Sequence, residues 1–241
     1  MNLILIYPEE WPTPADHEAE ITLNDRRFQY IKLIHKPAVG DKLRVGLLHG
    51  KLGSAQVLAL DARHIKLRVC LDQLPPQPSP ATLILALPRP PVLRRVLQTA
   101  TTMGVKHIYL IHSKRVEKSF WQSPQLRHDK IQEQLILGME QAQDTLPPKV
   151  YLKQAFKPFV EDQLKKIVTN QLALVAHPKD TDIRFPNQID EPCCIAIGPE
   201  GGFIPYEVEL LQAIGFSPRS LGARILKVET AVTVALGRCL I

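Results

Sequence analysis

At 241 residues, with 45% hydrophobic and 22% charged residues, the chain has the composition of an ordinary soluble protein that can bury a substantial core. Its apolar opening, Met1–Tyr7, has no basic start and breaks at Pro8, so it is too short for a signal peptide or a membrane-spanning helix. The net charge of +6 is uneven, because residues 24–68 carry ten Lys and Arg against three acidic residues. A nucleic-acid footprint and a mildly basic solvated surface explain that segment equally well.

The first part of the chain predicts a small β-barrel. Met1–Tyr7 is expected to form a strand, and Asn24–Phe28 to cap a short helix that ends near His35. Three further strands are predicted from short alternating runs, at residues 42–48, 52–60 and 64–71. Residues 74–80 contain four prolines, which predict a stiff linker between a domain over residues 1–73 and a second over residues 81–241.

After this linker, predicted strands and helices alternate. The expected strands cover residues 82–87, 105–111, 149–152, 172–176 and 194–197. The expected helices cover residues 91–104, 125–143, 159–168, 205–214 and 228–240. Such alternation predicts an α/β fold with a mostly parallel sheet covered by helices on both faces.

The cysteines and histidines do not suggest a metal site. Cys70, Cys193, Cys194 and Cys239 have no CxxC spacing, and the histidines show no HxxxH spacing. All four cysteines stand in apolar surroundings, so we expect buried free thiols and neither a zinc site nor a disulfide framework.

A glycine-rich turn, Gly198–Gly202 (Gly-Pro-Glu-Gly-Gly), separates an apolar run from a helical pattern that begins at Pro205. Glycines at the end of a strand let a ligand approach the backbone closely. The spacing fits neither GxGxxG nor the P-loop, which argues against a dinucleotide or nucleoside-triphosphate site of those types. A ligand loop at the carboxyl end of a parallel strand is favoured over a plain tight turn.

A second turn, Leu221–Leu226, follows about twenty residues later and places Arg224 beside Gly222 just before the last helix. Backbone contact to a ligand is the functional interpretation; an ordinary surface arginine is the alternative. Glu229, in the first turn of that helix, either interacts with the helix dipole or orients Arg224 or a substrate group. His177 follows the apolar run at 172–176, so a third loop is expected there, or a histidine without a role.

Together these segments resemble a known family. The sequence GPEGG followed by LGARILKVETA is similar to the C-terminal signature of the 16S rRNA (uracil-N3)-methyltransferase family, the small-subunit methyltransferase E group of the SPOUT class. The resemblance covers the whole chain. Ser113–Arg115 resembles the family's "SER" segment, Glu140-Gln141 its "EQ" pair, and the segments at 86–88 and 103–105 its strand-helix-strand opening. Residues 1–73, with Arg26-Arg27, resemble its PUA-like RNA-binding domain.

The resemblance implies a SPOUT fold, a parallel sheet with a C-terminal trefoil knot, that works as a cytoplasmic homodimer without a membrane segment. It implies S-adenosyl-L-methionine as the cofactor, held among three loops: Ala176–Pro178, Gly198–Gly202 and Leu221–Leu226. The cofactor-binding residues implied are Ala176, His177, Ile197, Gly198, Pro199, Gly201, Gly202, Leu221, Gly222, Ile225 and Leu226. No metal is expected.

The implied reaction is methylation of N3 of a uridine in 16S rRNA of the small ribosomal subunit. Arg224 is the candidate to stabilise the uracil anion, and Glu200 to accept the proton or orient the base. The candidates for binding rRNA phosphates are Arg26, Arg27, Lys32, Lys36, Lys42 and Arg44.

The chain departs from the family pattern on the substrate side, at Arg89–Pro91, Thr102, Ala142–Thr145 and Lys227. Two alternatives therefore stay open: an RNA-binding protein that keeps the fold without activity, and a methyltransferase of the same class that acts on tRNA.

Overall fold

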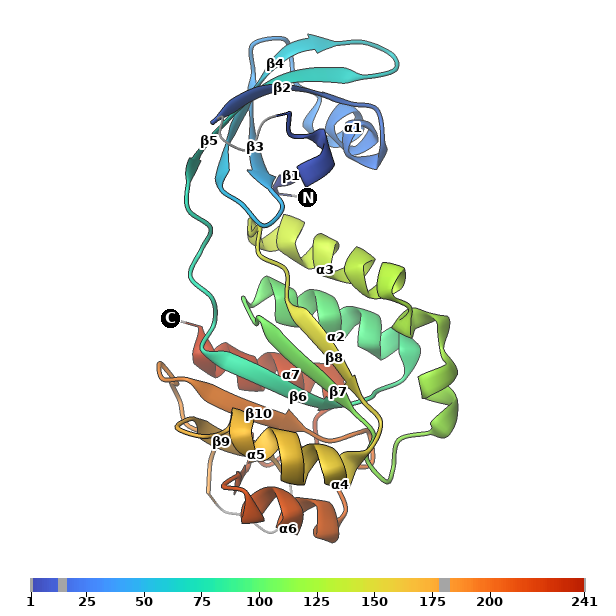
Figure 1. Cartoon of the computed structure of the whole chain (residues 1–241), viewed down its shortest axis with the longest axis vertical. Helices are drawn as coiled ribbons and strands as arrows, with labels where there is room; N and C mark the ends of the chain where they lie inside the picture. Colours follow the sequence, from blue (N-terminus) through green and yellow to red (C-terminus); the bar gives the residue numbers. More distant parts are fainter. Residues whose placement is uncertain (1, 13–16, 178–182, 241) are drawn as a thin grey trace. The chain divides into compact units, whose positions relative to one another are not determined.

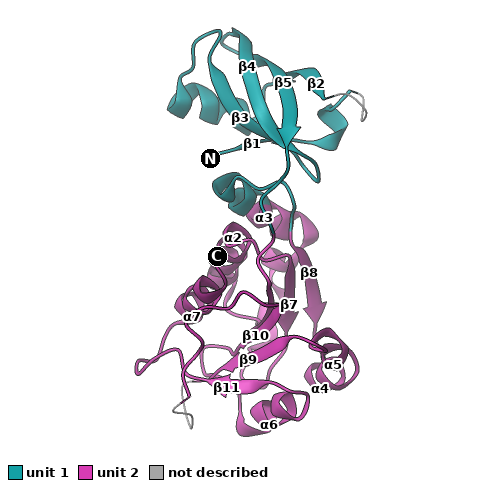
Figure 2. Ribbon diagram, turned by 90° about the vertical axis from the view of Figure 1, so that its left-hand side faces the viewer, with its two compact units in different colours: residues 1–77, 136–147 teal, residues 78–135, 148–241 magenta. Residues whose placement is uncertain are grey.

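The computed structural model describes residues 2–12, 17–177 and 183–240 (Figure 1). The chain forms two compact units, one of residues 1–77 with 136–147 and one of residues 78–135 with 148–241 (Figure 2). The first division falls between Gln77 and Pro78, inside the proline-rich segment. Residues 136–147, which the sequence assigned to the second domain, group with the first unit.

The first unit is built on a five-stranded sheet in the order β1-β3-β4-β5-β2. The strands are β1 (Ile4–Ile6), β2 (Glu18–Leu23), β3 (Lys42–Leu47), β4 (Leu52–Leu60) and β5 (Ile65–Gln73). β1 pairs with β3 in parallel, and the other pairs are antiparallel. Within the described part of the chain the predicted small β-barrel takes the form of a curled half-barrel, with β1 and β2 at its edges.

Period-two patterning explains this sheet. In β3 and β5 the apolar side chains Leu43, Val45, Leu67 and Val69 are buried on the inner face, while their neighbours point outward. β2 alternates in the same way, although the sequence analysis did not predict it. The three strands expected after residue 41 are confirmed: β4 has the predicted ends, and the ends of β3 and β5 differ by at most two residues.

The expected helix after Asp25 is also confirmed. α1 (Arg26–Tyr30) begins at Asp25, whose carboxylate accepts a hydrogen bond from the Arg27 N–H at 2.9 Å. A wider π-helical turn, Ile31–His35, continues it and ends at Lys36, which adopts a left-handed φ of 49°. Phe28 and Ile31 bury the inner side of this helix.

Residues 136–147 join the first unit through specific contacts. Met139 is fully buried against Leu3, Leu5 and Leu52. The Thr145 hydroxyl donates to the carbonyl of Gly50, and the Asn2 N–H donates to the carbonyl of Glu140 at 2.9 Å. The segment is therefore held by both apolar packing and hydrogen bonds.

The second unit contains a six-stranded sheet in the order β11-β9-β10-β6-β7-β8, and every pair in it is parallel. Its strands are β6 (Ala81–Ala86), β7 (His107–Ile111), β8 (Lys149–Lys153), β9 (Leu172–Ala176), β10 (Cys193–Ile197) and β11 (Ser217–Arg219). β6 and β10 are buried along their whole length, as continuous apolar runs in a parallel sheet require.

Helices cover both faces of this sheet, as predicted. They are α2 (Pro90–Thr102), α3 (His128–Ala142, whose last turns belong to the first unit), α4 (Phe156–Pro158), α5 (Lys165–Ile167), α6 (Pro205–Ala213) and α7 (Val228–Leu236). A π-helical turn, Phe159–Leu164, joins α4 to α5. Figure 2 shows α2 and α7 on one face of the sheet and α4 and α5 on the other. Among the described helices, none has the length and apolar character needed to cross a bilayer.

Candidate functional site

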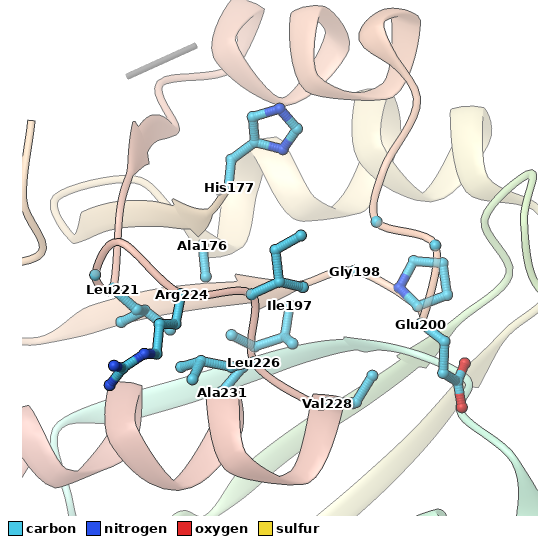
Figure 3. Close-up of a pocket in the computed structure, with 15 residues that line it drawn as sticks. Ala176, His177, Ile197, Gly198, Glu200, Leu221, Arg224, Leu226, Val228 and Ala231 are labelled. Carbon is cyan, nitrogen blue, oxygen red and sulfur yellow. The ribbon is translucent and has the colours of Figure 1, made fainter. Parts of the chain in front are cut away.

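Three neighbouring strands end at one edge of the parallel sheet. β9 lies between β11 and β10, and Ala176 is level with both Ile197 and Arg219 in the strand register. The carboxyl ends of parallel strands meet at the same edge, so the three following loops lie together. They enclose a cavity of about 240 Å³ (Figure 3).

This cavity brings together the residues that the sequence singled out. The residues that line it include all eleven expected cofactor-binding residues and both expected catalytic residues: Ala176, His177, Ile197, Gly198, Pro199, Glu200, Gly201, Gly202, Leu221, Gly222, Arg224, Ile225 and Leu226. Pro178, expected in the first loop, lies outside the described residues. The pairing of two distant glycine turns is thus a feature of the fold.

Glycine is required in the Gly198–Gly202 turn for two physical reasons. A Cβ on Gly198 would stand 2.9 Å from the backbone nitrogen of Phe203, closer than real side chains approach. Gly202 adopts a left-handed φ of 73°, and its N–H donates to the Pro199 carbonyl at 2.8 Å. The turn therefore presents backbone, and little side-chain bulk, to the cavity.

A segment after β7 braces this turn from the other side. The Arg115 guanidinium donates to the carbonyl of Gly201. The buried carboxylate of Glu207 accepts hydrogen bonds from the Lys114 N–H at 2.6 Å and from the Ile204 N–H at 3.0 Å. Sequence reasoning missed both contacts, although Glu207 in the first turn of α6 signals a helix start.

The loop that follows β11 is stabilised locally. The Ser220 hydroxyl donates to the Gly222 carbonyl at 3.0 Å, and the Gly222 N–H lies 3.3 Å from the same hydroxyl. α7 then adds Val228 and Ala231 to the cavity lining. Sequence reasoning missed these two residues; the signal available was their i, i+3 spacing, which places both on one face of the helix.

The charged residues of the cavity lie at opposite ends of it. Figure 3 shows the side chains of Arg224 and Glu200 pointing away from each other, with Ile197 and Leu226 between them. Glu200 accepts a hydrogen bond from the Arg89 N–H at 3.3 Å, and its carboxylate lies 3.8 Å from the Arg89 Nε. Glu229 forms its ion pair with Arg95 at 3.3 Å, so the structure does not join it to Arg224, which was one of the roles that the sequence left open.

In the first unit, the expected RNA-binding arginines have internal contacts. Arg27 is only 2% exposed, and its guanidinium donates to Glu10, to Asp25 and to the carbonyl of Leu5. Arg26 forms a two-pronged ion pair with the buried Glu140, with N–O distances of 2.6 and 3.0 Å. Arg27 is therefore built into the fold, and it presents no guanidinium to a phosphate.

The remaining basic candidates are exposed. Lys42 and Arg44 stand on the outer face of β3, and Lys32 and Lys36 lie on or just after the helix that begins at Arg26. The Lys32 Nζ donates to the carbonyl of Ala62 at 3.2 Å. These four side chains are exposed to solvent, and so is half of the Arg26 side chain despite its ion pair with Glu140.

The described cysteines are free thiols, but Cys70 is only partly buried, which corrects the expectation that all four are buried. It stands on the outer, solvated face of β5, whereas Cys193, Cys194 and Cys239 lie in the core of the second unit. Among the residues that the structure describes, no group of three or more His, Cys, Asp or Glu side chains is placed to hold a metal ion.

Comparison with known proteins adds independent information. Residues 75–240 match the model of a family described as an RNA methyltransferase domain. The chain is 29% identical over 239 residues to the ribosomal RNA small subunit methyltransferase E of Treponema pallidum, with 98% of this chain and 89% of that protein covered. It is 28% identical over 229 residues to the protein of that name from Synechocystis sp., with 92% and 73% covered.

A solved structure has the same fold. The ribosomal RNA small subunit methyltransferase E of Neisseria gonorrhoeae, crystallised with bound S-adenosyl methionine, superimposes with a TM-score of 0.71. The match covers 98% of this chain and 95% of that chain at 20% identity. At this identity the likeness concerns the fold of the chain.

Proposed function

The chain belongs to the RNA methyltransferase domain family and, within it, to the ribosomal RNA small subunit methyltransferase E group; from this premise we propose that it transfers the methyl group of S-adenosylmethionine to N3 of a uridine in 16S rRNA. The observation that carries the proposal is the cavity in which the family's two glycine signatures meet at the carboxyl edge of β9, β10 and β11.

The cavity suits the proposed cofactor chemically. Ile197, Leu221, Leu226, Val228 and Ala231 provide apolar surface for a purine ring, and the glycines leave backbone groups within reach of its polar edges. The bound cofactor would supply an electrophilic methyl group on a positively charged sulfur. The eleven residues expected to bind it are assigned that role in this proposal.

The protein's part in the reaction is placement and charge stabilisation. The uracil N3–H lies on the Watson–Crick edge, so the base must be unpaired or flipped out of its helix. The N3–CH₃ bond forms as the S–CH₃ bond breaks, and the N3 proton leaves to a base. We assign Glu200 to accept that proton or orient the uracil, and Arg224 to stabilise the negative charge on its oxygens. In-line placement of the reacting atoms supplies most of the rate.

The proposal extends to the fold and its surroundings. The outer face of the first unit, with Lys32, Lys36, Lys42 and Arg44, is proposed to bind rRNA phosphates as a PUA-like RNA-binding domain. Its affinity should fall steeply with salt, and charge reversal at Lys42 and Arg44 should flatten that dependence. The SPOUT trefoil knot, the homodimer and a cytoplasmic location beside the ribosome complete the proposal.

Mapping 3-methyluridine in 16S rRNA tests the reaction. A strain that lacks the gene should lose one such mark, and expression of the wild-type chain should restore it. Glu200→Gln and Arg224→Ala should fail to restore it fully and should slow single-turnover methyl transfer at saturating cofactor. If the mark persists in the deletion strain, the rRNA assignment fails; normal single-turnover rates would instead remove only the two residue roles.

Two further measurements separate the alternatives. Calorimetry with S-adenosylmethionine distinguishes an enzyme from an RNA-binding protein without activity, since the latter need not bind the cofactor. Mapping the same mark in total tRNA from both strains distinguishes a tRNA methyltransferase. A mark lost from tRNA and kept in 16S rRNA would replace the substrate that we propose.

A further inference from the structure

A second cavity, of about 440 Å³, lies where α2 and α7 begin. Three cationic side chains line it: Arg89 and Lys227, which directly precede the two helices, and Arg95. Two carboxylates, of Glu200 and Glu229, complete its charged lining. Three positive and two negative formal charges leave this cavity with a net charge of +1.

The second cavity adjoins the first. Both cavities are lined by Glu200, Ile225, Leu226 and Val228. A ligand group in the second cavity therefore stands next to whatever occupies the first. For a polynucleotide substrate, the group adjacent to the reacting base is its own or a neighbouring phosphodiester.

The cations of this cavity are available to an external anion. Arg89 and Arg95 are 67% and 62% exposed, and they face their carboxylates at 3.8 and 3.3 Å. Half-exposed ion pairs of this kind contribute little to stability, about 0.2–1 kcal/mol each. A phosphate, which a guanidinium binds through two parallel hydrogen bonds, can replace a carboxylate at such a site.

The N-termini of α2 and α7 differ in how they can attract an anion into the second cavity. α2 begins with Pro90 and Pro91, which have no N–H to offer, so attraction of an anion there depends on the arginine side chains and on the Arg89 N–H. That N–H already donates to the Glu200 carboxylate at 3.3 Å, which shows that an anion fits the position. α7 begins at Val228 without a side-chain cap, and its positive end faces the same space.

We propose that this second cavity binds a phosphodiester of the RNA substrate through Arg89, Arg95 and Lys227, and so holds the target nucleotide beside the methyl-donor cavity. The inference rests on the proposed function, because it needs an RNA substrate beside the first cavity. Glu229 holds Arg95 in the free protein and is displaced when RNA binds. Two positions where the chain departs from its family pattern, Arg89 and Lys227, thereby have a common role.

The test compares Arg95→Ala, Lys227→Ala and the double variant with the wild-type chain. Arg94→Ala is the matched control, because Arg94 is an exposed arginine on the same helix that does not line the cavity. Substrate is small ribosomal subunits from a strain that lacks the gene. The measurements are the KM for RNA, the salt dependence of RNA affinity by filter binding, and cofactor affinity by calorimetry.

Each single variant should weaken RNA binding about tenfold, as expected for loss of one charge-assisted contact. The slope of log affinity against log salt should fall by roughly 0.7–0.9 per substitution. Cofactor affinity should equal that of the wild type, which also reports that the variants are folded. Arg94→Ala should match the wild type in every measurement.

A variant with the opposite effect sharpens the test. Glu229→Gln removes the carboxylate that competes for Arg95, so RNA affinity should rise, by up to about fivefold. A merely structural role for the Arg95–Glu229 pair predicts no gain. Inorganic phosphate should inhibit the wild-type chain competitively with RNA and inhibit the double variant less.

The outcomes separate this inference from the proposed function. If the wild type transfers methyl groups while the variants keep its KM and salt slope, the phosphate site is wrong and the proposed function stands. If the wild type binds RNA without methylating it, the proposed function fails. In that case, equal RNA affinity of the wild type and the variants would also overturn the phosphodiester site in the second cavity. Weaker inhibition by inorganic phosphate with unchanged RNA affinity would assign the cavity to a free anion and also overturn it.

Discussion

The glycine loops of the second unit and the arginine pair of the first unit are the two conspicuous features of the sequence, and the structure uses them in different ways. The glycine turns at 198–202 and 221–226 meet at one cavity. Arg26 and Arg27, the most conspicuous basic pair, form ion pairs inside the first unit. The surface charge available there comes from less conspicuous residues such as Lys42 and Arg44.

The two features differ in the sequence separation between a residue and the groups that it contacts. A glycine turn acts through its own backbone, so its consequence is local and follows from the residues around it. An arginine acts through whichever acceptor the fold brings to it, and Arg26 finds Glu140 across 114 residues of sequence. In this chain the glycine turns therefore predicted the location of the cavity, whereas the arginine pair did not predict a surface for RNA.

The largest expected effect is the loss of stability when Arg27 of the first unit is replaced. Arg27→Ala should lower the free energy of unfolding by about 3 kcal/mol, because it leaves Glu10 and Asp25 facing each other without their common cation. Urea denaturation measures this change. The matched control, Lys42→Ala, removes an exposed cation and should change stability by less than about 0.5 kcal/mol. Equal stability of the two variants would contradict the internal role of Arg27.

Next in size is a substitution in the glycine turn. Gly198→Ala should cost about 1–3 kcal/mol of local packing energy, because its Cβ meets backbone atoms that cannot move aside. Calorimetry should show cofactor affinity reduced about tenfold or more. At Gly201 the nearest obstacle is the flexible side chain of Arg115, so Gly201→Ala should have the smaller effect. If Gly201→Ala had the larger effect, crowding of a Cβ against the backbone would not be the reason why the turn requires glycine at position 198.

Substitution of Glu207, which accepts hydrogen bonds beside the Gly198–Gly202 turn, should have an intermediate effect. Glu207→Gln keeps one acceptor for two partly buried N–H groups, so we expect a loss of about 1–2 kcal/mol in stability and weaker cofactor binding. Glu209→Gln, on the exposed side of the same helix, is the control. Thermal unfolding with and without cofactor measures both effects. Indistinguishable curves for the two variants would remove the bracing role of Glu207.

The smallest expected effect is a pH dependence in the first unit. Burial raises the pKa of Asp25, but hydrogen bonds from Arg27 outweigh burial and hold that pKa below its ordinary value of 3.8. A lowered folded pKa stabilises the protein above pH 3.8, and this stability is lost as the pH falls through the folded value. Asp25→Asn keeps the helix cap and removes the charge, so at pH 7 it should destabilise the chain by no more than a solvent-screened ion pair contributes, about 0.2–1 kcal/mol, and by less at pH 3. A constant difference between the two pH values would rule out the ionic contribution.

Most elements of the fold could be predicted from local pattern. The parallel sheet, its covering helices and the cap at Asp25 followed from apolar runs, proline and glycine positions, and a capping side chain. β2 was missed although its alternation was present in the sequence. β11 was missed because it has three residues, one of them Pro218, which leaves too little pattern to recognise.

The sequence by itself determined which residues form the glycine turns and where strands give way to helices, because these depend on backbone conformations that each residue permits. Only the tertiary structure decided which side chains meet. It joined Arg26 to Glu140, placed Arg89 and Arg95 beside two carboxylates, and added Val228 and Ala231 to the cavity. Such contacts depend on the order of strands in the sheet and on the packing of distant segments, which no local pattern specifies.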